Sequence, residues 1–183
     1  QSIILADALR FEYLNKKDKF KLPLKKVGYI RIVVITDYIY RYAIKQLEIL
    51  NQSNALLSLE SFIKIKFHPA GVIRNFIFKN QNISITDESI SELLNNNDLA
   101  FVCSNSAAAI EALASGIDTI LFNYPHSLDY SAVRGIKNLK YIYNSNEFDE
   151  AIRIFKKNQL KKVDFNRDFY FSNMDAWIKL MQN

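Results

Sequence analysis

Hydrophobic residues recur along this chain in short blocks separated by polar segments. Blocks rich in β-branched and aromatic residues predict strands at 30–36, 62–67, 82–86, 99–103, 118–122 and 139–143. The first of them, IRIVVIT, is apolar on both faces, which is typical of a strand buried inside a parallel sheet. The pattern therefore favours a parallel sheet of about six strands.

The segments between these blocks carry apolar residues at helical spacing. They predict helices at 2–14, 37–54, 89–96, 106–115 and 147–157, and after Ser172. Asp37 is the expected N-cap of the second helix, and Ser89 with Glu92 forms a capping pattern for the third. Gly116 is a typical C-terminal stop.

Strands that alternate with helices predict an α/β fold, with a Rossmann-like parallel sheet covered by helices on both faces. The expected organisation has three parts. Residues 1–29 form an N-terminal helix and a lysine-rich linker, residues 30–160 form the Rossmann-like domain, and residues 161–183 form a C-terminal helix. That last helix is expected to pack back on the domain or on a missing partner.

The stretch FVCSNSAAAIEALASG places small residues where a predicted strand turns into a helix. Ligands of parallel α/β sheets bind at the carboxyl ends of strands, and a helix N-terminus attracts anions. Ser104, Asn105 and Ser106 add hydroxyl and amide groups at this turn, and the three alanines that follow leave room for a ligand. The turn is therefore a candidate phosphate-binding site.

Glu111 lies seven residues beyond Ser104, on the same helical face. A carboxylate in this place can accept hydrogen bonds from ribose hydroxyls while a phosphate sits at the helix tip. The alternative is structural: Ser104 caps the helix and Glu111 is solvated or paired.

A second candidate site lies at the end of FIKIKFHP, where Lys64, Lys66 and His68 share one face by the two-residue period of a strand. His68 and Pro69 fall where this strand reaches the carboxyl edge of the sheet. A histidine there can donate to a phosphate or to a nucleotide hydroxyl, and Lys66 adds positive charge. Alternatively, His68 is a structural residue.

The loop after the fifth predicted strand is a third candidate. Tyr124 and the residues that follow it lie at the same expected edge, where Tyr124 can contact a base or a sugar, or can be purely structural. With two histidines in the whole chain and no metal-ligand spacing, neither a metal site nor another cofactor is expected.

Charge and composition exclude several classes of protein. The net charge of +5 arises within Lys16–Lys26, which favours a solvated linker or a peripheral membrane contact over a nucleic-acid groove. The loop after the first strand lacks glycines, which argues against a Walker ATPase or a dinucleotide oxidoreductase.

Cys103 is alone and is expected to be buried. The absence of a signal peptide, of a long apolar run and of an initiator Met suggests a cytoplasmic fragment of a longer protein.

With KFHP (Lys66 to Pro69) and SNSAAAIEALASG (Ser104 to Gly116), the chain resembles the C-terminal, nucleotide-sugar-binding domain of GT-B glycosyltransferases. It looks most like those that build bacterial surface polysaccharides, including sialyltransferase-like enzymes. The resemblance implies that His68 contacts the nucleotide or its phosphate, that Ser104 to Ser106 contact the phosphate, and that Glu111 contacts ribose.

The same resemblance implies a CMP- or UDP-linked sugar as the ligand, and an acceptor-binding N-terminal domain that this chain lacks. The general base of inverting relatives usually comes from that missing domain, so no catalytic residue is assigned and isolated transfer is not expected. The expected location is cytoplasmic, with possible contact at the inner face of the membrane. Two alternatives remain open: a UDP-sugar epimerase-like domain of the same architecture and a non-catalytic α/β interaction module.

Overall fold

The computed structural model describes residues 29–58, 60–80, 82–125, 131, 133–157, 160, 163 and 165. Strands and helices follow one another along this part of the chain: β1 (Ile30–Ile35), α1 (Tyr40–Gln52), α2 (Asn54–Leu57), β2 (Ser61–Lys66), β3 (Ile83–Ile85), α3 (Ile90–Asn96), β4 (Leu99–Cys103), α4 (Ala107–Ser115), β5 (Asp118–Phe122), β6 (Lys140–Ile142) and α5 (Ser145–Lys156). The predicted helices at 2–14 and after Ser172, and the lysine-rich segment Lys16–Lys26, lie outside the described residues.

The six strands form one parallel sheet in the order β3-β2-β1-β4-β5-β6. The α/β class and the parallel sheet expected from the sequence are therefore confirmed. β1 lies at the centre, with Val34 beside Ile65 of β2 on one side and beside Phe101 of β4 on the other. The order of the strands reverses at β1, because β2 and β3 lie to one side of it and β4 to β6 lie to the other.

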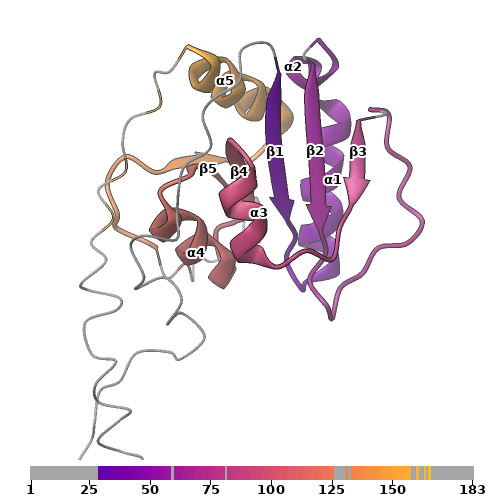
Figure 1. The fold of residues 1–183 in the computed structure, drawn as a ribbon, viewed down its shortest axis with the longest axis horizontal. Helices are drawn as coiled ribbons and strands as arrows, with labels where there is room; N and C mark the ends of the chain where they lie inside the picture. The colour runs from indigo at the N-terminus through magenta and orange to yellow at the C-terminus, as the bar shows by residue number, and fades with distance from the viewer. Residues whose placement is uncertain are drawn as a thin grey trace, which may run out of the picture.

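Helices cover both faces of the sheet (Figure 1). One hydrophobic core joins the sheet to α1 and α5, and includes Leu47 and Phe148. The second core joins the sheet to α3 and α4, and includes Leu93 and Ala112. Because consecutive strand residues point to opposite faces, Val33 packs into the second core while Val34 packs into the first.

The start of α1 differs from the expectation that Asp37 is its N-cap. The N-cap is Ile39, which has no side-chain capping hydrogen bond, and Asp37 lies two residues earlier. Its Oδ1 accepts a hydrogen bond of 2.7 Å from the backbone N–H of Ile39. Asp37 therefore shapes the loop after β1, and α1 begins later than predicted. By contrast, both hydrogen bonds of the predicted capping box between Ser89 and Glu92 are present.

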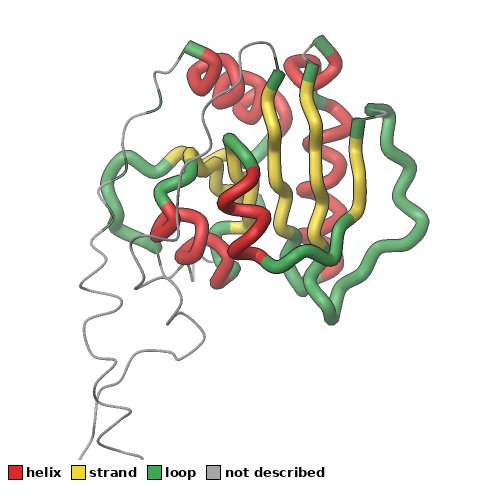
Figure 2. The backbone as a smooth tube through the Cα atoms, in the orientation of Figure 1, coloured by secondary structure: helices red, strands yellow, loops and turns green. Residues whose placement is uncertain are grey.

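The connection from β2 to β3 is a long irregular segment along the outer side of the sheet (Figure 2). Strands and helices thus do not alternate throughout the chain. Phe76 and Phe78 from this segment pack together, with ring centroids 5.0 Å apart, and against the core on the α1 side. They bury apolar surface where a crossover helix would otherwise do so.

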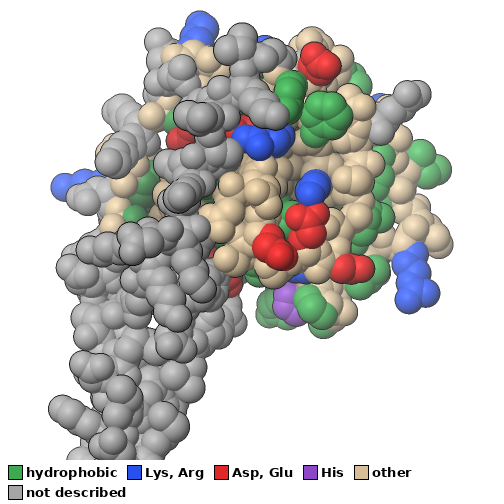
Figure 3. All heavy atoms as spheres, in the orientation of Figure 1, with side chains coloured by type: hydrophobic (Ala, Val, Ile, Leu, Met, Phe, Trp, Pro, Cys, Tyr) green, Lys and Arg blue, Asp and Glu red, His purple; other side chains and the backbone are tan. Residues whose placement is uncertain are grey.

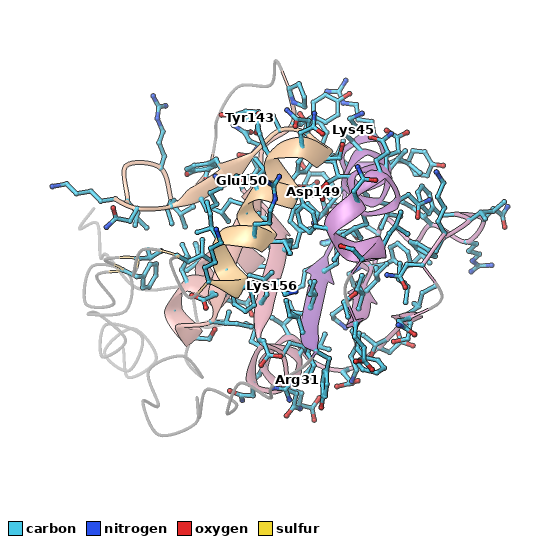
Figure 4. All side chains as sticks on the ribbon, turned by 90° about the horizontal axis from the view of Figure 1, so that it is seen from above. Arg31, Lys45, Tyr143, Asp149, Glu150 and Lys156 are labelled. Atoms are coloured by element: carbon cyan, nitrogen blue, oxygen red, sulfur yellow. The ribbon has the colours of Figure 1, made fainter. Side chains whose placement is uncertain are left out.

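Two buried carboxylates fix the amino-terminal edge of the sheet. Asp98, before β4, accepts hydrogen bonds from Arg31 Nη2 at 2.7 Å and from Arg31 Nε at 3.0 Å. Asp149 of α5 accepts a hydrogen bond of 2.5 Å from the hydroxyl of Ser53, just before α2. Seen from above, Arg31 lies at the lower edge of the molecule and Asp149 lies near the middle of the view, beside α5 (Figure 4).

The helices of the described residues are all too short or too polar to cross a lipid bilayer.

Candidate functional site

A cavity of about 530 Å³ lies at the carboxyl edge of the sheet, beside the point where the strand order reverses. Its walls come from the loop after β1, the end of β2, the start of α3 and the first half of α4. The polar side chains among the lining residues are Thr36, Asp37, Tyr38, Lys66, His68, Asn105, Ser106 and Glu111. The structure thus brings together two sequence motifs that are about 40 residues apart, as expected of a ligand site in a doubly wound sheet.

His68 is held by a tight turn at the end of β2. Its backbone N–H donates a hydrogen bond of 3.2 Å to the hydroxyl of Thr36, and its carbonyl oxygen accepts one of 2.8 Å from the N–H of Gly71. Its Nδ1 accepts a hydrogen bond of 3.2 Å from the N–H of Ala70. Because Nδ1 is an acceptor, the neutral ring carries its proton on Nε2, which can donate to an anionic ligand.

Gly71 allows this turn to pack closely against the loop after β1. A Cβ at this position would lie 3.1 Å from the carbonyl oxygen of Tyr38 and 3.3 Å from that of Asp37. The ring of Tyr38 lies 5.8 Å from that of His68, centroid to centroid. The two loops that carry Asp37 and His68 are therefore packed directly on each other.

Lys66 lines the cavity, whereas Lys64, two residues earlier, does not. Lys64 forms an ion pair with Glu88, whose pKa this hydrogen bond holds below the usual glutamate value. Lys66 donates a hydrogen bond of 3.3 Å to the backbone oxygen of Asp87, which is a neutral acceptor. Figure 3 shows acidic side chains grouped around the start of α3 on this face. The positive charge of Lys66 stays next to the cavity.

The turn before α4 presents the helix N-terminus to the cavity. Ser106 is the N-cap, and its hydroxyl accepts a hydrogen bond of 3.2 Å from the N–H of Ala108. Ala107 and Ala108 line the wall without bulky side chains. The positive end of the helix dipole at this turn is suited to a phosphate. Glu111 lies on the same wall one turn further along and is 7% exposed.

Asn105 adds an acceptor to this wall. Its Oδ1 is buried and has no hydrogen-bond partner among the residues that the structure describes. With the carboxylates of Asp37 and Glu111, the cavity holds three groups that accept hydrogen bonds. Lys66, His68 and the start of α4 supply donors. The cavity can therefore satisfy a ligand that combines hydroxyl or amino groups with an anionic group.

Ser104 and Tyr124 are the predicted site residues that the structure does not bring to this cavity. Ser104 is 1% exposed, and its hydroxyl donates a hydrogen bond of 3.4 Å to Oδ1 of Asn123. Tyr124 lies on the α1 side of the sheet, where its ring stacks on that of Tyr42. Lys66, His68, Pro69, Asn105, Ser106 and Glu111 all line the cavity.

Asp37 and Tyr38 line the cavity but were not among the residues singled out from the sequence for binding. Asp37 is 2% exposed, which is unusual for a carboxylate unless it has a structural or binding role. The signal available in the sequence was its position just after a predicted strand that is mostly apolar. Only the strand order shows that this loop lies between the ends of β2 and β4.

Cys103, at the end of β4, is buried as expected, with 1% of its surface exposed. Burial raises the pKa of its thiol strongly, and the neighbouring carboxylate of Asp37 adds to this shift. The thiol therefore stays protonated, which does not suit a nucleophile.

Within the described part of the chain, no three His, Cys, Asp or Glu side chains are grouped so that they could hold a metal ion.

Comparison with solved structures places this fold among known ones. The chain is similar to the glycosyltransferase SnogD from Streptomyces nogalater, with a TM-score of 0.53 and 14% identity over 89% of this chain and 47% of that one. It thus spans about half the length of SnogD. The similarity to the glycotransferase of kitacinnamycin has a TM-score of 0.44 at 12% identity, covers 88% of this chain and 41% of that one, and is too low to carry an argument.

A scan against protein-family models and a search of curated proteins found no match to the sequence. The likeness to known proteins is therefore one of structure. The chain has an α/β Rossmann-like fold of the kind that forms one half of a GT-B glycosyltransferase.

Proposed function

We propose that this chain is the nucleotide-sugar-binding half of a glycosyltransferase. The observation that carries the proposal is the single cavity that joins His68, Ser106 and Glu111 at the carboxyl edge of the sheet. The fold alone does not determine function, because one architecture supports several activities. The chemistry of the cavity is therefore the basis of the proposal.

The donors and acceptors of the cavity suit the two ends of a nucleotide. The phosphate lies against the start of α4, where the positive end of the helix dipole attracts it and the Ser106 hydroxyl donates a hydrogen bond to it. His68 Nε2 and the Lys66 ammonium group add donors from the opposite wall. Glu111 accepts hydrogen bonds from ribose hydroxyls. This arrangement stabilises a departing nucleotide, which is how such a half-site promotes sugar transfer.

The ligand proposed is a CMP- or UDP-linked sugar, bound without a metal ion. The acceptor and the general base belong to an N-terminal domain in a longer protein, and the pathway proposed is bacterial surface-polysaccharide synthesis in the cytoplasm. Contact with the inner face of the membrane through Lys16–Lys26 belongs to the same proposal. The length of SnogD, about twice that covered by this chain, is consistent with a second domain.

A thermal-shift titration with CMP, UDP and free sugars tests nucleotide binding. A ligand at about 100 times its dissociation constant stabilises a protein by about 2.7 kcal/mol, which raises the melting temperature measurably. We expect CMP or UDP to do so, and His68→Ala and Ser106→Ala to weaken the effect. Failure of every nucleotide to shift the melting temperature at millimolar concentration contradicts the proposal.

Ser89→Ala is a matched control for Ser106→Ala. Each substitution removes the side-chain N-cap of a helix, and each is expected to lower stability by about 1 kcal/mol. Ser89 does not line the cavity, so its loss should leave nucleotide affinity unchanged. Equal effects of both variants on affinity would mean that Ser106 acts only through helix stability.

A further inference from the structure

A second cavity, of about 720 Å³, lies where α1 begins and β5 ends. Its polar and aromatic lining comprises Tyr40, Arg41, Tyr42, Lys45, Glu48 and Tyr124. Its size is within the range of small-molecule sites. No part of the proposed nucleotide site accounts for this cavity.

The aromatic wall of this cavity is rigidly supported. The rings of Tyr42 and Tyr124 stack with centroids 4.4 Å apart and planes inclined by 20°. Tyr42 is 7% exposed, and the ring of Tyr124 also meets that of Phe122 edge to face, at 6.4 Å. Both tyrosines therefore belong to the hydrophobic core on one side and to the cavity wall on the other. Tyr40, which is 63% exposed, offers a free aromatic surface at the rim.

Arg41 gives this wall a positive charge that no carboxylate of the described residues neutralises. Its guanidinium carbon lies 5.3 Å from the ring centroid of Tyr42 and 5.6 Å from that of Tyr124, which fits cation–π contact. Arg41 forms no ion pair with a carboxylate of the described residues. A guanidinium held over aromatic rings keeps its planar donors free for a carboxylate.

The other two charges of the cavity compensate each other. Lys45 Nζ lies 3.1 Å from Glu48 Oε2, and both side chains are partly exposed. With Arg41, the lining therefore carries one excess positive charge. The first turn of α1 also contains no acidic residue. Lys45 projects on the side of the sheet that carries α1 and α5 (Figure 4).

The two cavities are neighbours along the chain but have no lining residue in common. Asp37 and Tyr38 line the first, and Tyr40 to Tyr42 line the second. Ala108 of the first belongs to the core under α3 and α4, whereas Tyr42 of the second belongs to the core under α1. A ligand in each can therefore be bound at the same edge of the sheet at the same time.

We propose that the second cavity binds an acidic saccharide. The apolar face of the sugar ring packs against the tyrosine surface, and its carboxylate pairs with the guanidinium of Arg41. Lys45 and Glu48 supply donors and acceptors for hydroxyl groups. The binding of this saccharide does not rest on the proposed function above.

Isothermal titration of the full chain with D-glucuronic acid tests the proposal, with D-glucose as the neutral match. We expect saturable binding of glucuronate, and binding of glucose weaker by about tenfold, the effect of losing one charged hydrogen-bonding pair. Arg41→Gln should reduce glucuronate affinity by a similar factor. Tyr40→Ala, at an exposed position, should weaken both sugars.

Arg153→Gln is the control for charge, because Arg153 is an exposed arginine of α5 that does not line this cavity. It should leave glucuronate binding unchanged. The proposal is overturned if glucuronate does not bind, if Arg41→Gln binds as tightly as the wild type, or if Arg153→Gln weakens binding equally. Displacement of glucuronate by CMP would equally overturn it, because the two sites would then be one.

The failure of this proposal and that of the proposed function are distinguishable. His68→Ala should weaken the response to CMP and leave glucuronate binding intact. If the wild-type chain binds glucuronate but no nucleotide, the glycosyltransferase proposal is contradicted, and if it binds a nucleotide but no glucuronate, the saccharide site is contradicted.

Discussion

The side-chain nitrogen of Gln46 donates a hydrogen bond of 3.0 Å to the backbone oxygen of Phe101 in β4. It also donates one of 3.3 Å to the backbone oxygen of Ile35 in β1. Gln46 is fully buried on α1, and its Oε1 has no partner among the described residues. One amide thus connects β1 to β4, the two strands at which the strand order reverses. Ile35 also lines the candidate nucleotide cavity.

Replacement of this amide by a carboxyl group should be strongly destabilising. In Gln46→Glu the donor that faces two carbonyl oxygens is lost, and an ionised carboxylate would be buried without a cation. We expect a loss of about 3 kcal/mol in the free energy of unfolding at pH 7. Urea denaturation measures this loss.

The loss should become smaller as the pH falls. Burial raises the pKa of the new carboxyl group in the folded state, so the folded protein binds the proton more tightly than the unfolded chain does. Stability of Gln46→Glu therefore increases from pH 7 towards pH 5. Gln46→Met, which also lacks the donor but has no charge, should lose about 1–2 kcal/mol at both values. If the stabilities of Gln46→Glu and Gln46→Met changed with pH in the same way, the side chain at position 46 would not be buried.

The ion pair between Arg31 and Asp98 should contribute measurably to stability. The Asp98 side chain is 4% exposed, accepts two hydrogen bonds from the guanidinium and raises the pKa of Arg31. Because the Arg31 side chain is 23% exposed, we expect Asp98→Ala to cost about 2–3 kcal/mol, towards the lower end for a buried pair. Glu150→Gln, which breaks an exposed pair with Arg153, should change stability by less than about 0.5 kcal/mol in the same denaturation experiment. Similar effects of the two substitutions would contradict the assigned difference in burial.

The Lys64–Glu88 pair should make the free energy of unfolding decrease as the pH falls below the usual pKa of a glutamate. Lys64 holds the pKa of Glu88 below its usual value. Its stabilising contribution is therefore complete above the unfolded-state pKa of about 4.3 and is lost as the pH falls through the lower folded-state pKa. Melting curves of the wild type and Glu88→Gln should differ slightly at pH 7 and converge in acid.

Salt provides the control for this exposed pair. The difference in melting temperature between wild type and Glu88→Gln should shrink at high ionic strength. Lys64→Gln should show the same difference from wild type at pH 7. A difference that persists unchanged in acid and in salt would have to come from something other than the ion pair.

Gly71→Ala should couple a local packing change to nucleotide binding. The new Cβ would lie 3.1 Å from a backbone oxygen of Tyr38, so the turn that holds His68 must shift. We expect a loss of about 1 kcal/mol in stability, and, if the proposed function holds, a weakening of CMP or UDP binding by about tenfold. Calorimetric titration measures the second effect.

Gly116→Ala is the control for Gly71→Ala, because it should lower stability without changing nucleotide binding. Gly116 has a φ of +80° at the far end of α4, so alanine there is strained and costs a similar amount. It does not line the cavity, and nucleotide affinity should remain that of the wild type. A loss of affinity in Gly116→Ala would show that the binding measurement responds to stability alone.

Local sequence patterns were sufficient for the strands and for the ends of α3 and α4. The apolar run of β1, the capping box of Ser89 and Glu92 and the stop at Gly116 depend on neighbouring residues, so they could be read directly. The N-cap of α1 could not, because Asp37 bonds to the N–H of Ile39 in the loop and leaves the helix to begin at Tyr40. An N-cap at Asp37 and a loop in which Asp37 bonds to Ile39 would show the same local sequence, namely an acidic residue shortly before the apolar positions of the helix.

The candidate site depended on non-local information that the sequence lacks. The motifs at His68 and Ser106 were found because each contains unusual residues at a strand end. The contribution of Asp37 followed only from the place of β1 between β2 and β4. Tyr124 was expected at the correct edge of the sheet, but a strand end does not show on which face its next residue lies, and Tyr124 lies on the face of α1.

The contact between Asp149 and the start of α2 has a consequence for the order of folding. The four residues of α2 are too few to form a stable helix alone, and the carboxylate that accepts hydrogen bonds from the N–H groups of Asn54 and Ala55 comes from α5, 94 to 95 positions later. Closing so long a loop loses chain entropy before the contact can form. The corner between α2 and α5 therefore assembles late, once both halves of the sheet have met.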